Sequence, residues 1–142
     1  MKVKNILICE DIRIEIGNKL SAMGIFGDTL NIEIPEQQVA GPQAAVILAA
    51  LITIENIDPK ADPKDYSIIV TIALGKNNIG KMIAKGASAG NDKILHLAVP
   101  KFSVPLIDSD KLFINVQLTK KDKVKNEYKA TLNINVTKTV QQ

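Results

Sequence analysis

Apolar and polar residues alternate along two segments close to the C-terminal end of the chain. In residues 112–119 and again in 130–137, every second residue is Leu, Ile, Val or Ala, and most of the residues between them are Asn, Gln or Thr. A period of two places the apolar side chains on one face of an extended chain. We therefore predict two strands with one buried face each, paired as a hairpin through a longer charged turn at 120–126.

Four further segments carry related patterns. Residues 29–35, 79–85 and 93–99 are predicted to be strands on the same alternation. In segment 66–74 the even-numbered residues are all apolar and the odd-numbered residues are partly apolar, which predicts a strand buried on both faces.

Turn-forming residues separate these segments. Clusters rich in Gly, Asn, Asp and Ser predict loops at 75–78, 86–92 and 106–110. We expect the prolines between strands or at strand ends, where a missing backbone donor costs least; they are Pro35, Pro42, Pro59, Pro63, Pro100 and Pro105.

Segment 43–55 is mostly apolar, and its periodicity fits either a buried strand or a buried helix. We favour a strand from Val46 to Glu55, because a single helix among about eight strands would need a surface of its own to cover. About eight short strands with turns every eight to twelve residues predict an all-β fold. The expected architecture is one domain over residues 1–142, a sandwich of two antiparallel sheets, with a closed β-barrel as the alternative.

The segment 11–16 alternates charged residues with isoleucines. Ile12, Ile14 and Ile16 are expected to face the core, and Asp11, Arg13 and Glu15 to face water. By the same alternation Glu10 would be carried inward. A buried carboxylate requires a partner. Either the alternation of inward and outward side chains is interrupted at Glu10, or Glu10 pairs with Arg13 or a lysine.

Residues 17–18 favour a two-residue type II′ turn, with glycine at the position that needs positive φ. That turn places Ile14 opposite Ser21. A register one residue longer places Ile14 opposite Ala22 and matches the apolar faces better. A bulge near Gly24 would reconcile the two registers.

The first hairpin combines a specific set of residues in order: Cys9, Glu10, Asp11, Arg13, Glu15, Lys19, Ser21, Gly24, Ile25 and Phe26. This order resembles the opening of a family of uncharacterised bacterial and phage proteins that carry a small domain of unknown function. The resemblance covers about the first 35 of the 142 residues. It implies a β-sandwich for the remainder, and it implies no activity, cofactor or site residue.

Composition narrows the class of protein. The chain is 46% hydrophobic and 23% charged with a net charge of +3, so attraction to nucleic acid or to acidic membranes is expected to be weak. Cys9 is the only cysteine, which excludes an intrachain disulfide and favours a cytoplasmic location. No signal peptide is expected at the N-terminus, and the longest apolar stretch, 44–54, is short for a membrane span.

Candidate chemistry is sparse. A carboxylate cluster at Glu10, Asp11 and Glu15 could perform acid/base catalysis only if one carboxylate were desolvated, and we favour a solvated strand face. His96 is the only histidine, so a metal site is not expected. A catalytic triad would need His96 with one of three serines, none of which lies in a strained-turn motif: Ser88, Ser103 and Ser109.

The lysine-rich segment 120–129 contains one aromatic residue, Tyr128, where a single-stranded nucleic-acid site would need several. We interpret it as a charged hairpin tip that keeps the sheet edge soluble.

Two functions remain open. The first is a non-catalytic module that presents loops or an edge strand to another protein, such as a second copy of itself or a host enzyme inhibited by a phage protein. Its predicted interaction residues are Glu10, Asp11, Arg13, Glu15, Lys120, Lys121, Lys123 and Tyr128. The alternative is a small-ligand-binding or hydrolytic sandwich with a site near His96 and loop 86–92. We assign no catalytic, metal-binding or cofactor-binding residue and expect no cofactor, and the absence of catalytic pairs favours the first function.

Overall fold

The structure is a computed structural model that describes residues 1–17, 19–35, 44–55, 63–85 and 94–139. These residues form nine strands and one short 3₁₀-helix, η2. The elements are β1 (Lys2–Glu15), β2 (Lys19–Ile25), β3 (Thr29–Pro35), β4 (Ala45–Glu55), η2 (Pro63–Asp65), β5 (Tyr66–Leu74), β6 (Asn77–Lys85), β7 (Leu95–Pro105), β8 (Asp110–Lys120) and β9 (Lys123–Thr139). The described part of the chain contains no helix with the length and hydrophobicity that a membrane span requires.

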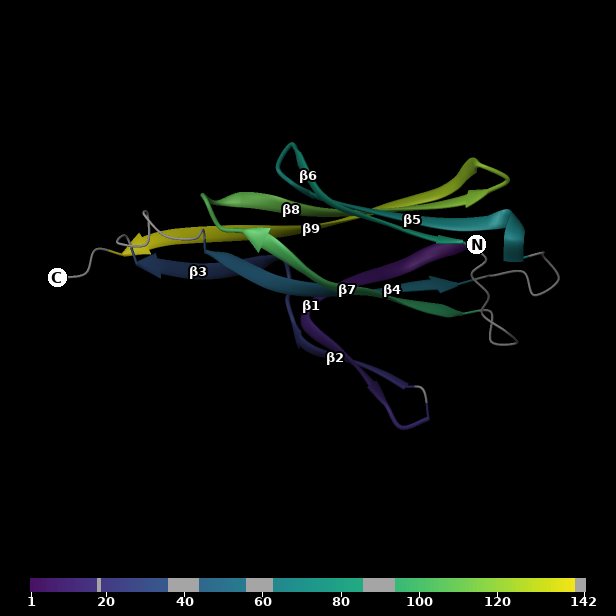
Figure 1. Ribbon diagram of the computed structural model, residues 1–142, viewed down its shortest axis with the longest axis horizontal. Helices are drawn as coiled ribbons and strands as arrows, with labels where there is room; N and C mark the ends of the chain where they lie inside the picture. Colours follow the sequence, from purple (N-terminus) through teal and green to yellow (C-terminus); the bar gives the residue numbers. More distant parts are fainter. Residues whose placement is uncertain (18, 36–43, 56–62, 86–93, 140–142) are drawn as a thin grey trace.

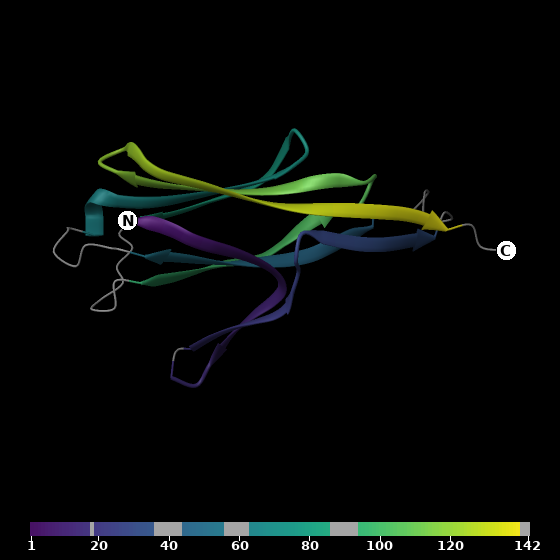
Figure 2. The ribbon, with the colours of Figure 1, turned by 180° about the vertical axis from the view of Figure 1, so that it is seen from behind.

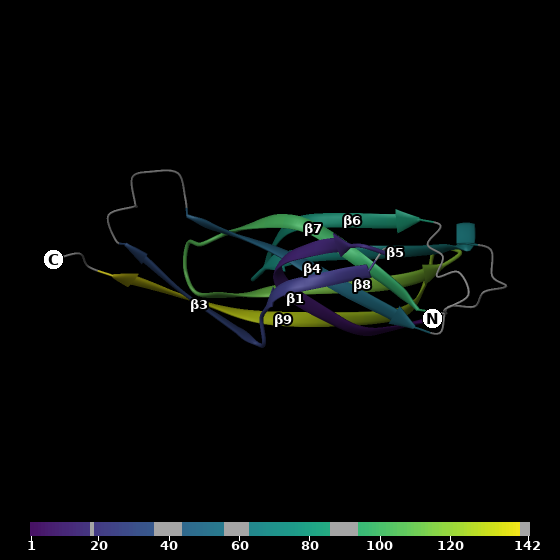
Figure 3. The ribbon, with the colours of Figure 1, turned by 90° about the horizontal axis from the view of Figure 1, so that it is seen from below.

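The strands form two sheets that pack face to face as a β-sandwich, as predicted (Figure 1). One sheet has four strands in the order β2-β1-β4-β7, and the other has five in the order β3-β9-β8-β5-β6. The two sheets are separate rather than one closed sheet. All paired neighbours are antiparallel except β3 and β9, which run parallel side by side (Figure 3).

The core lies between the sheets and is built from aliphatic side chains. On β8 the predicted alternation is confirmed, because every second residue from Leu112 to Leu118 is fully buried. These rows pack against apolar side chains of the four-stranded sheet, such as Ile52 and Val104. β-branched residues suit this pleated surface, which explains how a chain with few aromatic residues forms a core.

The ambiguous segment 43–55 contains strand β4, as favoured, and residues Leu48–Ile54 of it are buried on both faces. The prediction that 66–74 would be buried on both faces is wrong. On β5 the row from Tyr66 to Ile72 is buried, but the alternate residues are only half-buried. They lie on the outer face of the five-stranded sheet, where no described layer covers them.

The hairpin β8–β9 is longer than the alternation indicated, and the predicted longer turn is wrong. Pairing continues to Lys120 and Lys123, which leaves only Lys121 and Asp122 in the turn. Both have positive φ, 50° and 62°. Backbone pairing needs no apolar side chain, so the strands extend past the point at which the hydrophobic pattern ends.

Pro100 lies inside β7, so the expectation that the prolines fall between or at the ends of strands is wrong there. β7 is an edge strand, and its register with β4 shifts between the pairs Leu48–Phe102 and Ala50–Val99. An edge strand with a bulge tolerates a residue that lacks a backbone donor. Pro42, Pro59 and loop 86–92 lie outside the described residues.

Candidate interaction surface at the β1–β2 hairpin

The hairpin of β1 and β2 projects from the sandwich as a two-stranded ribbon (Figures 1 and 2). β1 pairs with β4 only from Lys2 to Cys9, and it pairs with β2 from Cys9 to Glu15. Beyond Cys9, no third strand of the described residues pairs with the ribbon. A two-stranded ribbon buries little surface by itself, so its apolar side chains need another partner to be covered.

One face of this ribbon is apolar. The pairs Ile12–Ala22 and Ile14–Leu20 lie on the side that continues the core face of β1, and we call these four residues the isoleucine face. Ile14 is 78% exposed, and Ile16, in the turn, is 97% exposed. The prediction that the isoleucines of 12–16 face the core is therefore wrong for Ile14 and Ile16, because the second sheet does not extend over them.

Both predicted registers of this hairpin are wrong. Ile14 lies opposite Leu20 and Glu15 opposite Lys19, so residues 16–18 connect the strands. Gly17 has the expected positive φ, +82°, but the expected two-residue type II′ turn is wrong, because three residues connect the strands. The register is the same on both sides of Gly24, and no bulge is needed, because this three-residue connection matches the apolar faces.

Glu10 is exposed rather than carried into the core. Strict alternation fails to predict this because β4 stops pairing with β1 at Cys9, and Glu10 is the first residue of the projecting ribbon. The side chain of Glu10 lies over Gly24, whose φ is +65°. Glycine leaves room for the carboxylate to pack against the strand backbone.

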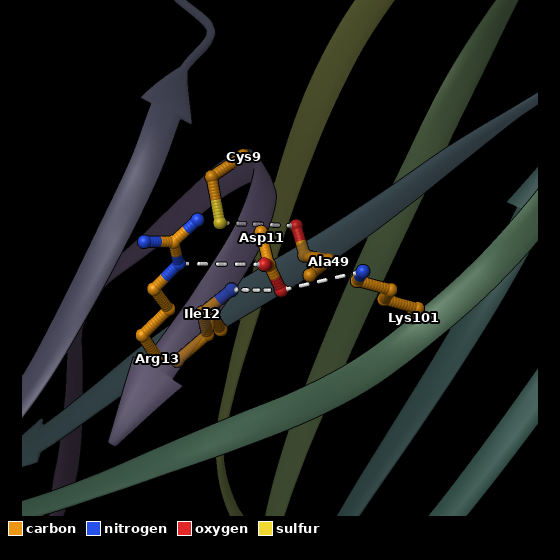
Figure 4. A network of polar contacts seen from close by, with 6 residues as sticks. All are labelled: Cys9, Asp11, Ile12, Arg13, Ala49 and Lys101. Carbon is orange, nitrogen blue, oxygen red and sulfur yellow. Dashed lines mark hydrogen bonds and ion pairs between the residues drawn. The ribbon is translucent and has the colours of Figure 1, made fainter. Parts of the chain in front are cut away.

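Asp11 joins two cations across the sheet (Figure 4). Its Oδ2 lies 3.8 Å from Nε of Arg13, and its Oδ1 lies 3.6 Å from Nζ of Lys101 on β7. The Oδ1 also accepts a hydrogen bond of 2.9 Å from the backbone N–H of Ile12. The two cations are more than half exposed, so these pairs contribute about 0–1 kcal/mol each to stability.

This arrangement does not form an acid/base site. Glu10 and Asp11 are consecutive on a strand and point to opposite faces. Among the described residues, no group of three or more His, Cys, Asp or Glu side chains could hold a metal ion.

Cys9 is buried beneath this network, and its Sγ donates a hydrogen bond to the carbonyl oxygen of Ala49 at 3.6 Å. Burial raises the pKa of the Cys9 thiol, and the charge of Asp11 raises it further, while a backbone hydrogen bond at Asp11 opposes them. A thiol with a raised pKa is a poor nucleophile at neutral pH.

His96 is exposed on β7, and its Nδ1 lies 3.2 Å from Oγ1 of Thr53. Ser109 uses its hydroxyl to contact the backbone of Val136 on β9. Ser88 and loop 86–92 lie outside the described residues. Within the described chain, neither Ser103 nor Ser109 forms a hydrogen bond with His96.

The predicted interaction residues fall into two separate groups. Glu10, Asp11, Arg13 and Glu15 lie on β1, whereas the four others lie at the β8–β9 hairpin of the five-stranded sheet: Lys120, Lys121, Lys123 and Tyr128. The two hairpins extend to opposite sides of the sandwich (Figure 1). In the second group the ammonium of Lys120 lies 5.6 Å from the ring centroid of Tyr66, which is a structural contact within the sheet.

Sequence reasoning missed the isoleucine face and Lys101 as components of this surface. The sequence contains no signal for either, because the lengths of β1 and β2 and the residue at which β1 leaves β4 are properties of the folded chain.

No family model matches the chain, and no curated protein matches it significantly. The function must therefore be argued from the surface itself.

Proposed function

We propose that this protein is a non-catalytic interaction module that binds a protein partner through the β1–β2 hairpin. The observation that carries the proposal is the exposure of Ile14 and Ile16 on a ribbon that projects from the sandwich. A contiguous apolar patch on a soluble domain costs free energy in water unless another molecule covers it. The isoleucine face gives a partner that apolar contact.

The edge of β2 supports the same proposal. β2 is the outermost strand of the four-stranded sheet, so one side of its backbone has no strand beside it within the described residues. An extended segment of a partner can add to such an edge by backbone hydrogen bonds, and side chains then select the partner. The partner would gain hydrogen bonds along β2 and apolar contact with Ile14 and Leu20 together.

The opposite face of the ribbon carries charges of both signs. Asp11, Arg13 and Glu15 occupy every second position of β1. Lys19 lies opposite Glu15 in the register of β1 and β2. A mixed-charge face keeps an isolated ribbon hydrated and disfavours indiscriminate pairing of edges. We propose a cytoplasmic location on the evidence of the single cysteine. The resemblance to bacterial and phage proteins stays a prediction.

A site-specific photocrosslinker tests the proposal in the organism that encodes the protein. Benzoylphenylalanine at position 14 is expected to form a defined adduct, whereas the same group at position 107 is not. Ile107 is a matched control because it is also exposed, at 54%, but lies between β7 and β8, away from the hairpin.

The double change Ile14→Thr and Ile16→Thr should abolish complex formation, because threonine keeps the β-branched shape and removes the apolar surface. Ile107→Thr should leave it intact. Light scattering identifies whether the adduct partner is a second copy of the chain. Equal crosslinking at positions 14 and 107, or a complex that survives the double change, would contradict the proposal.

A further inference from the structure

The outer face of the five-stranded sheet contains a hollow of about 320 Å³ near the end of the β5–β6 hairpin. Beside it β6 has one extra residue, because Ile72 pairs with Gly80 but Ala73 pairs with Asn78. Such a bulge increases the local twist. The end of the hairpin consequently rises away from the other sheet (Figure 1).

Small residues keep the hollow open. Ala73 lies between Asn78 and Phe113 on neighbouring strands, and Gly75 forms the turn with φ +58°. All of these residues line the hollow. Its volume is at the lower end of the range for small-ligand sites, which suits a ligand of one or two rings.

The polar side chains of the hollow offer both donors and acceptors. Thr71 contributes a hydroxyl, and Asn78 and Gln117 contribute carboxamides. Asn115 also lines the hollow, and its Nδ2 donates to Oε1 of Glu127 at 3.1 Å. The Oδ1 of Asn115 is buried and has no hydrogen-bond partner within the described part of the chain.

The charges around the hollow are balanced. Lys76 and Lys129 line it, and no carboxylate of the described residues does. Glu127 is bound to Asn115 beside it, and Asp110 lies next to the turn, where a Cβ on Gly75 would be 2.6 Å from its Oδ2. Two cations with two neighbouring anions give little net attraction for an anionic ligand.

Phe113 adds an apolar surface to this polar site. Its ring is half-buried on the outer face, and the ammonium of Lys129 lies 5.1 Å from the ring centroid. A pyranose ring presents polarised C–H groups to one side and hydroxyls around its edge. The electron-rich face of Phe113 attracts such C–H groups as it attracts the ammonium, and a sugar ring stacked on the same face would displace the ammonium of Lys129.

We infer that this hollow is a binding site for a neutral saccharide, with Phe113 beneath the sugar ring and the carboxamides around its hydroxyls. The site is on the sheet that does not carry the β1–β2 hairpin, so the inference does not depend on the proposed protein partner. A single open site of this size is expected to bind with a Kd of about 1 mM.

Amide chemical-shift perturbation of the full chain tests the inference with maltose, cellobiose, lactose and diacetylchitobiose as probes. At least one disaccharide is expected to shift amides of β5, β8 and the β5–β6 turn, and inorganic phosphate is not. Ala73→Leu, which fills the hollow, should reduce affinity at least tenfold. Ser67→Leu is the matched control, because Ser67 is on the same face of β5 but does not line the hollow.

Phe113→Leu provides a second variant that removes the ring without filling the space, and it should also weaken binding. Shifts caused only by phosphate, shifts at other positions, or no shifts with any of the four disaccharides would overturn the inference. Equal binding by the Ala73→Leu and Ser67→Leu variants would overturn it as well.

Discussion

The side chain of Glu10 packs against the backbone of Gly24 so closely that a Cβ on Gly24 would lie 2.7 Å from Glu10 Cδ. Gly24 also has φ +65°, which residues with a side chain rarely adopt. This pair of residues fixes the base of the projecting hairpin, at the point where β1 leaves β4.

Gly24→Ala should therefore destabilise the protein by about 1–2 kcal/mol, measured by urea unfolding. Gly27→Ala is the control, because a Cβ at Gly27 meets no atom within 4 Å, and its cost should be below about 0.5 kcal/mol. Combining Gly24→Ala with Glu10→Ala separates the steric conflict with Glu10 from the cost of the positive φ. If steric conflict contributes, the double variant recovers part of the loss; equal losses for Gly24→Ala and Gly27→Ala would refute the prediction.

A second prediction compares one residue type in two environments. Ile114 is fully buried on β8, whereas Ile14 is 78% exposed on β1. Ile114→Ala should cost about 2–5 kcal/mol of unfolding free energy, because it leaves a cavity in the core. Ile14→Ala should cost less than about 1 kcal/mol. Similar losses for the two variants would mean that Ile14 is covered in the free protein.

The same two residues show what the sequence can predict. Alternation correctly indicates which residues of a strand share a face, both around Ile114 and around Ile14. It contains no information on whether a second layer lies over that face. That depends on how far the five-stranded sheet extends over β1, which is a tertiary property. The sandwich and its core rows were therefore predictable, whereas the exposed isoleucine face was not.

The hollow could not be predicted from the sequence for a related reason. The segment 75–78 was predicted to be a loop, but only Gly75 and Lys76 form the turn, because β6 begins at Asn77. The bulge opposite Ala73 depends on pairing between β5 and β6. Phe113, Asn115 and Lys129 come together only when β8 and β9 pair in the observed register. Strand alternation alone cannot specify which residues become cross-strand neighbours.

The turn of the β8–β9 hairpin offers a stabilising change. Lys121 and Asp122 both have positive φ, which is the type I′ geometry that favours Asn-Gly. Changing Lys121→Asn together with Asp122→Gly should stabilise the protein by about 0.5–1 kcal/mol, because the strain is relieved. The melting temperature should rise by about 2–4 °C. Asp108→Gly, outside this turn and without positive φ, should not raise it; an unchanged or lower melting temperature for the double variant would contradict the prediction.

Cys9 makes the free energy of unfolding depend on pH in the alkaline range. Burial raises the pKa of its thiol above the ordinary value of 9.0 in the folded protein. The unfolded chain therefore loses the proton at lower pH than the folded protein does, which favours unfolding. The stability contribution of Cys9 should be complete below the unfolded-state pKa and should be lost as the pH rises through the folded-state pKa.

Urea unfolding from pH 7 to about pH 10 measures this loss, and Cys9→Ala provides the comparison because it removes the thiol and changes no other ionisable side chain. The difference in unfolding free energy between the native chain and Cys9→Ala should shrink as the pH rises. The thiol should also react slowly with iodoacetamide at pH 8 until urea unfolds the chain, since its Sγ is buried against Ala49. A difference that stays constant over this range, or alkylation at the rate of a free thiol in the folded protein, would show that Cys9 is solvated.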